Sequence, residues 1–294
     1  MGTELSRGQL FDPILVTDLL SKVKGYSSLA KLSAQKPIPF NGNKIFTFTM
    51  DTDIDIVAEN GKKTHGGVTL EPKKMMPIKI EYGARVSDEF MYASEEARID
   101  ILKSFNEGFA KKLARGLDIM AFHGFNPRTK QASSVIGSNH FDATVTQKVV
   151  KTANPDADIE TAVNLVQGSE GIVTGIAMDT AFSTTLAKVT NGENGPKMYP
   201  ELAWGGNPDT INGLKSDVNT TVSFTTEDLV VLGDFENMFK WGYAKDVQLE
   251  VIEYGDPDNS GKDLKGYNQI YLRAEAFLGW AIMDENSFAR ITKS

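Results

Sequence analysis

Residues 85–124 read RVSDEFMYASEEARIDILKSFNEGFAKKLARGLDIMAFHG and contain no proline. Apolar side chains recur every four residues along this stretch, a spacing that places them on one face of an α-helix. The stripe consists of Ile101, Phe105, Phe109, Leu113 and Leu117. With Ser94 as N-cap and Gly124 as the stop, we predict a helix from Ser94 to about Phe122, roughly 43 Å long.

A helix with a single apolar stripe covers a broad surface on one side, and a sheet is the expected partner. The C-terminal segments 247–255 and 267–291 are rich in apolar and aromatic residues and are predicted to be strands of that sheet. Residues 154–235, between the helix and these strands, alternate short helical and extended patterns. That texture predicts a compact lobe of mixed helix and sheet, so the fold class is α+β.

Two segments with strict alternation precede the helix, at residues 45–57 and 76–86. Alternation with period two indicates strands with one apolar face. The segment between them is polar and basic, so we predict one long antiparallel hairpin with a charged tip. Such a hairpin is only marginally stable alone, and its apolar face therefore needs a partner surface. The expected interface residues are Phe46, Phe48, Ile78 and Ile80 on the apolar faces, Asp51, Asp53 and Asp55 on the acidic face, and Lys62, Lys63, Lys73 and Lys74 at the tip.

The three aspartates of the first strand are interpreted as a solvated or salt-bridged strand face. If the acidic strand and the basic tip meet on neighbouring subunits, their opposite charge would set the register of the contact more than its affinity.

Composition limits the classes of function. The chain has 294 residues, no cysteine, ordinary hydrophobic content and a formal net charge of −8. Disulfides and thiolate metal sites are excluded, and no apolar run is long enough to span a membrane. The acidic balance argues against tight general binding of nucleic acid, which depends on lysine and arginine. The N-terminus lacks the pattern of a signal peptide, which predicts a protein made and kept in a cytoplasm.

No recognisable catalytic, metal or cofactor motif is present, and we predict a protein that is not an enzyme. The three histidines are widely scattered, and the phosphate-loop, dinucleotide and nucleophile-elbow motifs do not occur. The segment DPDNSGKD (256–263) begins like a calcium loop, but its twelfth position is Tyr267 where a glutamate is required. We interpret it as an Asp- and Gly-rich hairpin turn.

The order of these segments resembles the major capsid protein family of tailed bacteriophages, the Hong Kong 97 fold. The likeness covers nearly the whole chain and is carried by a series of short motifs, none of which is specific alone. These are VSDEFMYASEEA at the start of the long helix, GLDIMAFHG at its end, TINGLKSDV, LGDFENMFKWGY, and the closing segment IYLRAEAFLGWAIMDENSFARI.

This resemblance implies a division of the chain into parts. It implies an N-terminal arm (1–43), an extended loop (44–87), a peripheral domain with the spine helix (88–155), an axial domain (156–250), and C-terminal strands of the peripheral domain (251–294). For the first 40 residues, a short helix followed by a loop of the same domain is an equally good interpretation of the sequence. Many members of that family carry an N-terminal scaffolding extension that a protease removes, whereas this sequence begins almost at the arm. The resemblance therefore implies either a separate scaffolding protein or a chain that is already trimmed.

The implied function is a major capsid protein of a tailed bacteriophage. Its partners would be other copies of itself in pentamers and hexamers of an icosahedral shell, a scaffolding protein, a portal, decoration proteins, and packaged double-stranded DNA bound without sequence specificity. The implied location is the virion, with assembly in the host cytoplasm. Two alternatives stay open: an encapsulin-like compartment that encloses an enzyme, and a hydrolase built from scattered carboxylates.

Overall fold

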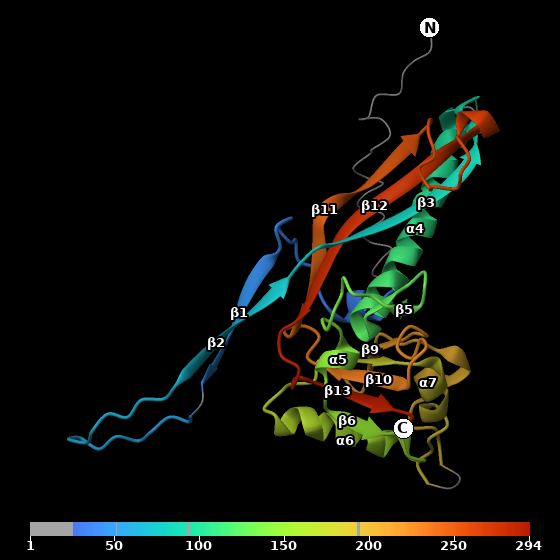
Figure 1. The fold of residues 1–294 in the computed structure, drawn as a ribbon. Helices are drawn as coiled ribbons and strands as arrows, with labels where there is room; N and C mark the ends of the chain where they lie inside the picture. The colour runs from blue at the N-terminus through green and yellow to red at the C-terminus, as the bar shows by residue number, and fades with distance from the viewer. Residues whose placement is uncertain (1–25, 51, 93–94, 193–194) are drawn as a thin grey trace.

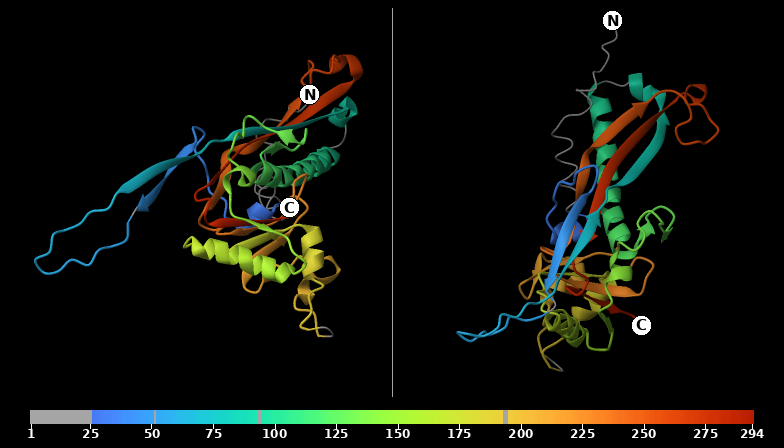
Figure 2. Two further views of the ribbon diagram at one scale, coloured as in Figure 1. Left: turned by 60° about the horizontal axis from the view of Figure 1, so that its bottom comes forward. Right: turned by 60° about the vertical axis from the view of Figure 1, so that its left-hand side comes forward.

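The computed structural model describes residues 26–50, 52–92, 95–192 and 195–294. Three parts are visible in Figure 1: a long three-stranded sheet with a helix beside it, a lobe around a six-stranded sheet, and a two-stranded ribbon that projects from the body. The ribbon stands clear of the body in both views of Figure 2 as well. Among the described residues, no helix is long and apolar enough to cross a membrane.

The predicted long helix is present as α4 (Glu95–His123) and ends at Gly124, whose φ of +68° is a left-handed conformation that glycine adopts readily. The predicted N-cap, Ser94, lies outside the described residues. The helix packs on an antiparallel sheet, as predicted from its single stripe. In sheet order, the strands are β11 (Phe239–Ile252), β12 (Gln269–Ile282) and β3 (Ile78–Ser87).

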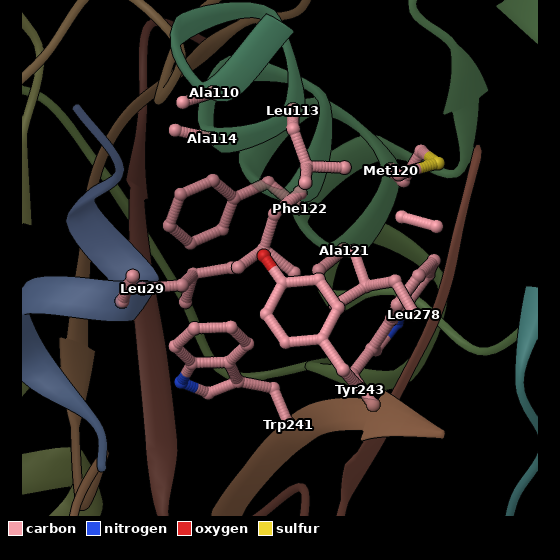
Figure 3. Packing of buried hydrophobic residues seen from close by; sticks show 14 of the residues in the cluster. Leu29, Ala110, Leu113, Ala114, Met120, Ala121, Phe122, Trp241, Tyr243 and Leu278 are labelled. Atoms are coloured by element: carbon pink, nitrogen blue, oxygen red, sulfur yellow. The ribbon is translucent and has the colours of Figure 1, made fainter. Parts of the chain in front are cut away.

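The apolar stripe of α4 forms much of the main core. Phe109, Leu113 and Leu117 are buried with Trp241 and Leu278 of the sheet, and Figure 3 shows the close packing of this cluster. Towards the N-terminus of the helix, its outer end, the apolar stripe is less buried. Phe105 is half-buried, with its ring 5.9 Å from that of Tyr82, and Ile101 remains 42% exposed. The prediction for Ile101 as a packing residue is therefore wrong. At this end, α4 extends beyond the described residues that pack against it.

The lobe holds the second sheet. Its order is β6 (Lys148–Val150), β13 (Phe288–Thr292), β10 (Asp228–Gly233), β7 (Gly175–Met178), β9 (Leu214–Val218), β8 (Thr210–Ile211). The pairs β13–β6 and β7–β9 are parallel and the others are antiparallel. A separate apolar cluster joins this sheet to α6 (Pro155–Gly168) and α7 (Thr180–Leu186).

Short elements connect these parts. They are the helices α3 (Ser28–Leu32) and α5 (Phe141–Thr144), the 3-10 turns η1 (Asp88–Tyr92), η2 (Pro200–Gly205) and η3 (Lys265–Tyr267), and the strand pair β4 (Phe125–Asn126) and β5 (Gln131–Ala132). The helix α3 contacts α4 and the lobe strands β7 and β9, so it connects the two parts of the body.

The predicted pairing of residues 45–57 with 76–86 is wrong. The ribbon consists of β1 (Asn43–Met50) and β2 (Val68–Met75), whereas β3 pairs with β12. The second strand of the ribbon therefore lies in the segment that we assigned to the tip. Alternation identifies the buried face of a strand but not its partner, which explains the error.

The strands of each sheet do not follow the domain boundaries that the resemblance implies. Most of β11 lies in the range assigned to the axial domain, yet it belongs to the long sheet. In the opposite sense, β13 lies in the C-terminal range assigned to the peripheral domain, yet it belongs to the lobe. Each part of the body is therefore built from segments that are far apart in the sequence.

Candidate subunit interface

The ribbon presents one apolar face that the described body leaves open. Residues that stand opposite each other in an antiparallel pair point to the same face. Phe46 is opposite Pro72, and Met50 is opposite Val68. Phe46 is 57% exposed, and Val68 and Leu70 are each 54% exposed. The predicted residue Phe48 lies between them in β1, opposite Leu70 in the register, but its side chain is outside the described part.

The base of the ribbon is fixed to the body. Met75 is buried in a small cluster with Ile38, Ala281 and Met283, and Ile45 packs against this cluster. The ammonium group of Lys73 lies 3.3 Å from a carboxylate oxygen of Glu285. The predicted tip residues Lys73 and Lys74 thus lie at the base of the ribbon, in β2, and not at its tip. This base holds the ribbon at a defined direction from the body.

The tip of the ribbon follows β1 as an irregular loop. Asp53 and Asp55 lie in this loop rather than in a strand, because pairing stops at Met50. The hydroxyl of Thr64 donates to Asp55 at 2.8 Å, which links the two sides of the loop. Lys62 and Lys63 are exposed in the same loop, and Asp51 lies outside the described residues. The loop also exposes two apolar side chains almost completely: Ile54 (97%) and Ile56 (96%).

Two of the predicted interface residues belong to the core of their own chain instead. Ile78 and Ile80 of β3 are half-buried and pack against the main cluster beside α4. They are in the long sheet, so they are not available to a neighbouring subunit in the way that the wrong strand pairing implied. The apolar interface candidates that remain lie on β1, on β2 and in the tip.

A buried carboxylate that the sequence analysis did not single out connects α4 to the N-terminal segment. Asp118 accepts the backbone N–H groups of Ser28 and Leu29, at 3.0 and 3.2 Å, which are at the start of α3. It also accepts the hydroxyls of Ser27 and Thr221. Burial raises the pKa of Asp118 to about 6, while these hydrogen bonds oppose the rise. The sequence signal was a lone aspartate inside an apolar run, ARGLDIMAF.

A second buried charged cluster lies where the end of α4 meets the lobe. Arg290 Nη1 lies 2.8 Å from Asp142 Oδ1 and 2.9 Å from Asp228 Oδ2. His123 Nδ1 is 2.8 Å from the other oxygen of Asp142, and its Nε2 is 2.9 Å from the carbonyl oxygen of Thr221. His123, Asp142 and Asp228 are close enough together for a metal ion. However, the guanidinium of Arg290 already lies between the carboxylates, so the cluster is a structural ion-pair network.

The pKa values in this network diverge for physical reasons. Burial and the hydrogen bond with Asp142 raise the pKa of Asp228. The pKa of Asp142 is lowered despite its burial, by the hydrogen bond from His123 and the charge of Arg290. Burial opposes the charged form of His123, but the contacts with Asp142 prevail and raise its pKa. The two carboxylates of the network therefore differ in acidity: Asp142 loses its proton more readily than usual and Asp228 less readily.

The chain was compared with known proteins. The family model described as the phage capsid family matches residues 8–293. Among solved structures, a protein of Mycobacterium phage Ogopogo is 30% identical, with a TM-score of 0.78 over 91% of this chain and 92% of that chain. No curated protein matches.

Two more distant structures share the fold alone. A protein of Gordonia phage Cozz is 23% identical, with a TM-score of 0.69 over 92% of this chain and 86% of that chain. The capsid of an empty GTA particle is 12% identical, with a TM-score of 0.64 over 91% of this chain and 96% of that chain.

These findings confirm the predicted α+β capsid fold, and they favour a phage capsid over an encapsulin-like compartment. The chain belongs to the phage capsid family and is a major capsid protein, a structural subunit of a phage shell.

Proposed function

We propose that copies of this chain assemble as pentamers and hexamers into an icosahedral shell, and that the ribbon of each copy lies across a neighbouring copy. The observation that carries this proposal is the open apolar face of β1 and β2. Full burial of one large apolar side chain contributes ~1.5–3 kcal/mol. A few such side chains per contact, repeated around a closed shell, are sufficient because the contacts act together.

We further propose that the shell encloses double-stranded DNA without reading its sequence. The formal net charge of −8 supports this role, since a wall of the same sign as DNA does not hold the packaged strand in place. Assembly in the host cytoplasm, with a separate scaffolding protein, a portal and decoration proteins, completes the proposed pathway. No enzymatic step is assigned to the chain itself.

Negative-stain electron microscopy of the purified protein tests the proposal. We expect closed particles from the wild-type chain and dispersed subunits from Leu70→Asp, which places a charge on the apolar face of β2. Thr69→Asp is the matched control, because its side chain points to the opposite face of the same strand. Circular dichroism would verify that both variants are folded. Normal particles from folded Leu70→Asp would refute the role of the ribbon.

A deletion offers a second test of the same role. Removal of residues 60–67 shortens the tip but leaves β1, β2 and the base of the ribbon in place. We expect a folded subunit that fails to close shells. If the deletion leaves assembly intact, residues 60–67 have no part in the contact, and the proposed interface is restricted to the two strands and to Ile54 and Ile56 of the tip.

A further inference from the structure

The connection between β11 and β12 has the spacing of a calcium loop, and a positively charged nitrogen sits at its centre. In such loops, oxygen ligands come from positions 1, 3 and 5 and from the backbone carbonyl of position 7, with glycine at position 6. In this chain Asp256, Asp258 and Ser260 stand at positions 1, 3 and 5, and Lys262 stands at position 7. Gly261 is at position 6 with φ +79°, a conformation that favours glycine.

All four of these oxygens point at one atom of β3. Arg85 Nη2 lies 2.6 Å from Asp256 Oδ1 and 2.5 Å from Asp258 Oδ1. It lies 2.7 Å from Ser260 Oγ and 2.8 Å from the carbonyl oxygen of Lys262. A guanidinium nitrogen of this kind has only two hydrogens, yet four oxygens surround it. The two hydrogens are therefore shared among the four oxygens, and a cluster of oxygens within 2.8 Å of one positively charged atom is also what a bound cation requires.

The rest of the guanidinium binds the same region. Its Nε donates to Asp258 Oδ2 at 2.9 Å, and its Nη1 donates to Gln269 at 3.2 Å, where β12 begins. The pKa of Arg85 is raised above its ordinary value, first by the hydrogen bond with Asp258. The pKa of Asp258 is held well below its usual range by the same hydrogen bond. The carboxylate of Asp258 is therefore stabilised in its ionised form by the charge of Arg85.

The loop lacks the part of a calcium site that binds most strongly. A calcium loop ends on a bidentate glutamate at position 12, and Tyr267 stands there in this chain. Two carboxylates, one hydroxyl and one carbonyl are thus left with a single positive charge from β3. The loop lies at the end of the long sheet that is remote from the lobe (Figure 1). The contacts of Arg85 with this loop join the β11–β12 connection to the last residues of β3.

We propose that Arg85 supplies the cation of this loop, so that the β11–β12 connection closes on β3 without a metal ion. Removal of Arg85 should then leave a vacant site that accepts a divalent or trivalent cation. The order of this end of the sheet is accordingly independent of calcium in the wild-type chain and becomes dependent on calcium when Arg85 is absent.

The test compares wild-type protein with Arg85→Ser by terbium luminescence, calcium titration calorimetry and thermal unfolding. We expect no terbium binding by the wild-type chain, and the same Tm in calcium and in chelator. Arg85→Ser should bind one terbium ion per chain. Its Tm should fall in chelator by a few degrees, on the order of 2–4 °C, and recover in calcium. Specific calcium binding by the wild-type chain would overturn the proposal, and so would a folded Arg85→Ser that binds no terbium.

Three further variants make the result specific. Arg85→Ser combined with Asp256→Asn removes one ligand and should lose terbium binding. Arg85→Lys retains a positive charge for the site and should bind no terbium. If Arg85→Ser does not fold, the wild-type measurement still decides, because specific calcium binding by the wild-type chain overturns the proposal. Arg273→Ser removes an arginine of the same sheet that pairs with Glu250 outside the loop, and it should not bind terbium either. Terbium binding by Arg85→Lys or Arg273→Ser equal to that of Arg85→Ser would contradict the role assigned to Arg85.

Discussion

The backbone N–H of Ser28 donates to Asp118 Oδ2 at 3.0 Å, although ninety residues separate the two in sequence. Asp118 is fully buried in α4, and Ser28 begins the first described helix. A carboxylate at that point accepts the free N–H groups of the helix start, as an N-cap side chain does. The N-terminal segment is thereby hydrogen-bonded to α4 through one titratable group, so this part of its attachment depends on pH.

Replacement of Asp118 by asparagine should change the pH dependence of stability. The pKa of Asp118 is about 6 in the folded chain, against an ordinary value of 3.8. Since the folded state holds the proton more tightly, the stabilisation from this group is full below about pH 4 and is lost as the pH rises through 6. From pH 4 to pH 7, wild type should lose about 2 kcal/mol relative to Asp118→Asn.

Urea unfolding of unassembled subunits, followed by circular dichroism at several pH values, measures this difference. Asp118→Asn cannot titrate, and it also replaces one acceptor by a donor, so it should be less stable than wild type at every pH. Only the change in the difference with pH reports the titration. A constant difference between pH 4 and pH 7 would show that Asp118 keeps an ordinary pKa when buried.

Truncation along α4 should reveal where the helix is covered. Phe109→Ala removes a ring that is only 2% exposed, and it should reduce the free energy of unfolding by about 3–5 kcal/mol. Ile101→Ala, two turns earlier on the same stripe, should cost under ~1 kcal/mol in the free subunit because Ile101 is 42% exposed. Equal losses for the two variants would mean that the outer end of α4 is covered in the free subunit.

Loss of Arg290 should be costly and should depend on pH. Arg290→Met leaves Asp142 and Asp228 buried with only the imidazole of His123 beside them, and breaking such a pair costs ~3–5 kcal/mol. The pKa values of both carboxylates would rise in the folded variant, so the loss should be larger at pH 8 than at pH 5. The exposed pair of Lys215 and Glu236 provides the control, since Lys215→Met should cost less than ~1 kcal/mol. A loss for Arg290→Met as small as that control would contradict the account of the network.

Local periodicity predicted much of the fold. The long helix was expected from Ser94 to about Phe122 and is observed at Glu95–His123. Its stripe was expected to lie on the closing strands, and Phe109, Leu113 and Leu117 pack there. These results follow from the sequence because the period of an amphipathic helix is a local property, and a 29-residue helix repeats it many times.

The strand partners could not be predicted in the same way. Both β2 and β3 present apolar side chains at alternate positions, and alternation does not state which strand each one joins. The polar and basic composition of residues 58–75 made β2 look like part of the tip, although such residues are common in a ribbon whose faces and edges are exposed. The Asp118 and Arg290 clusters were missed because their partners lie far away in sequence, and only the folded chain brings them together.

The most direct measurement of the central claim uses the absence of cysteine from the chain. A single cysteine in place of Leu70 lies on the apolar face of the ribbon, and one in place of Thr69 lies on the opposite face. In dissociated subunits, we expect maleimide to label both variants. In assembled shells, Leu70→Cys should be protected while Thr69→Cys remains reactive. Equal labelling of Leu70→Cys in subunits and in intact shells would contradict the claim that a neighbouring copy covers the ribbon.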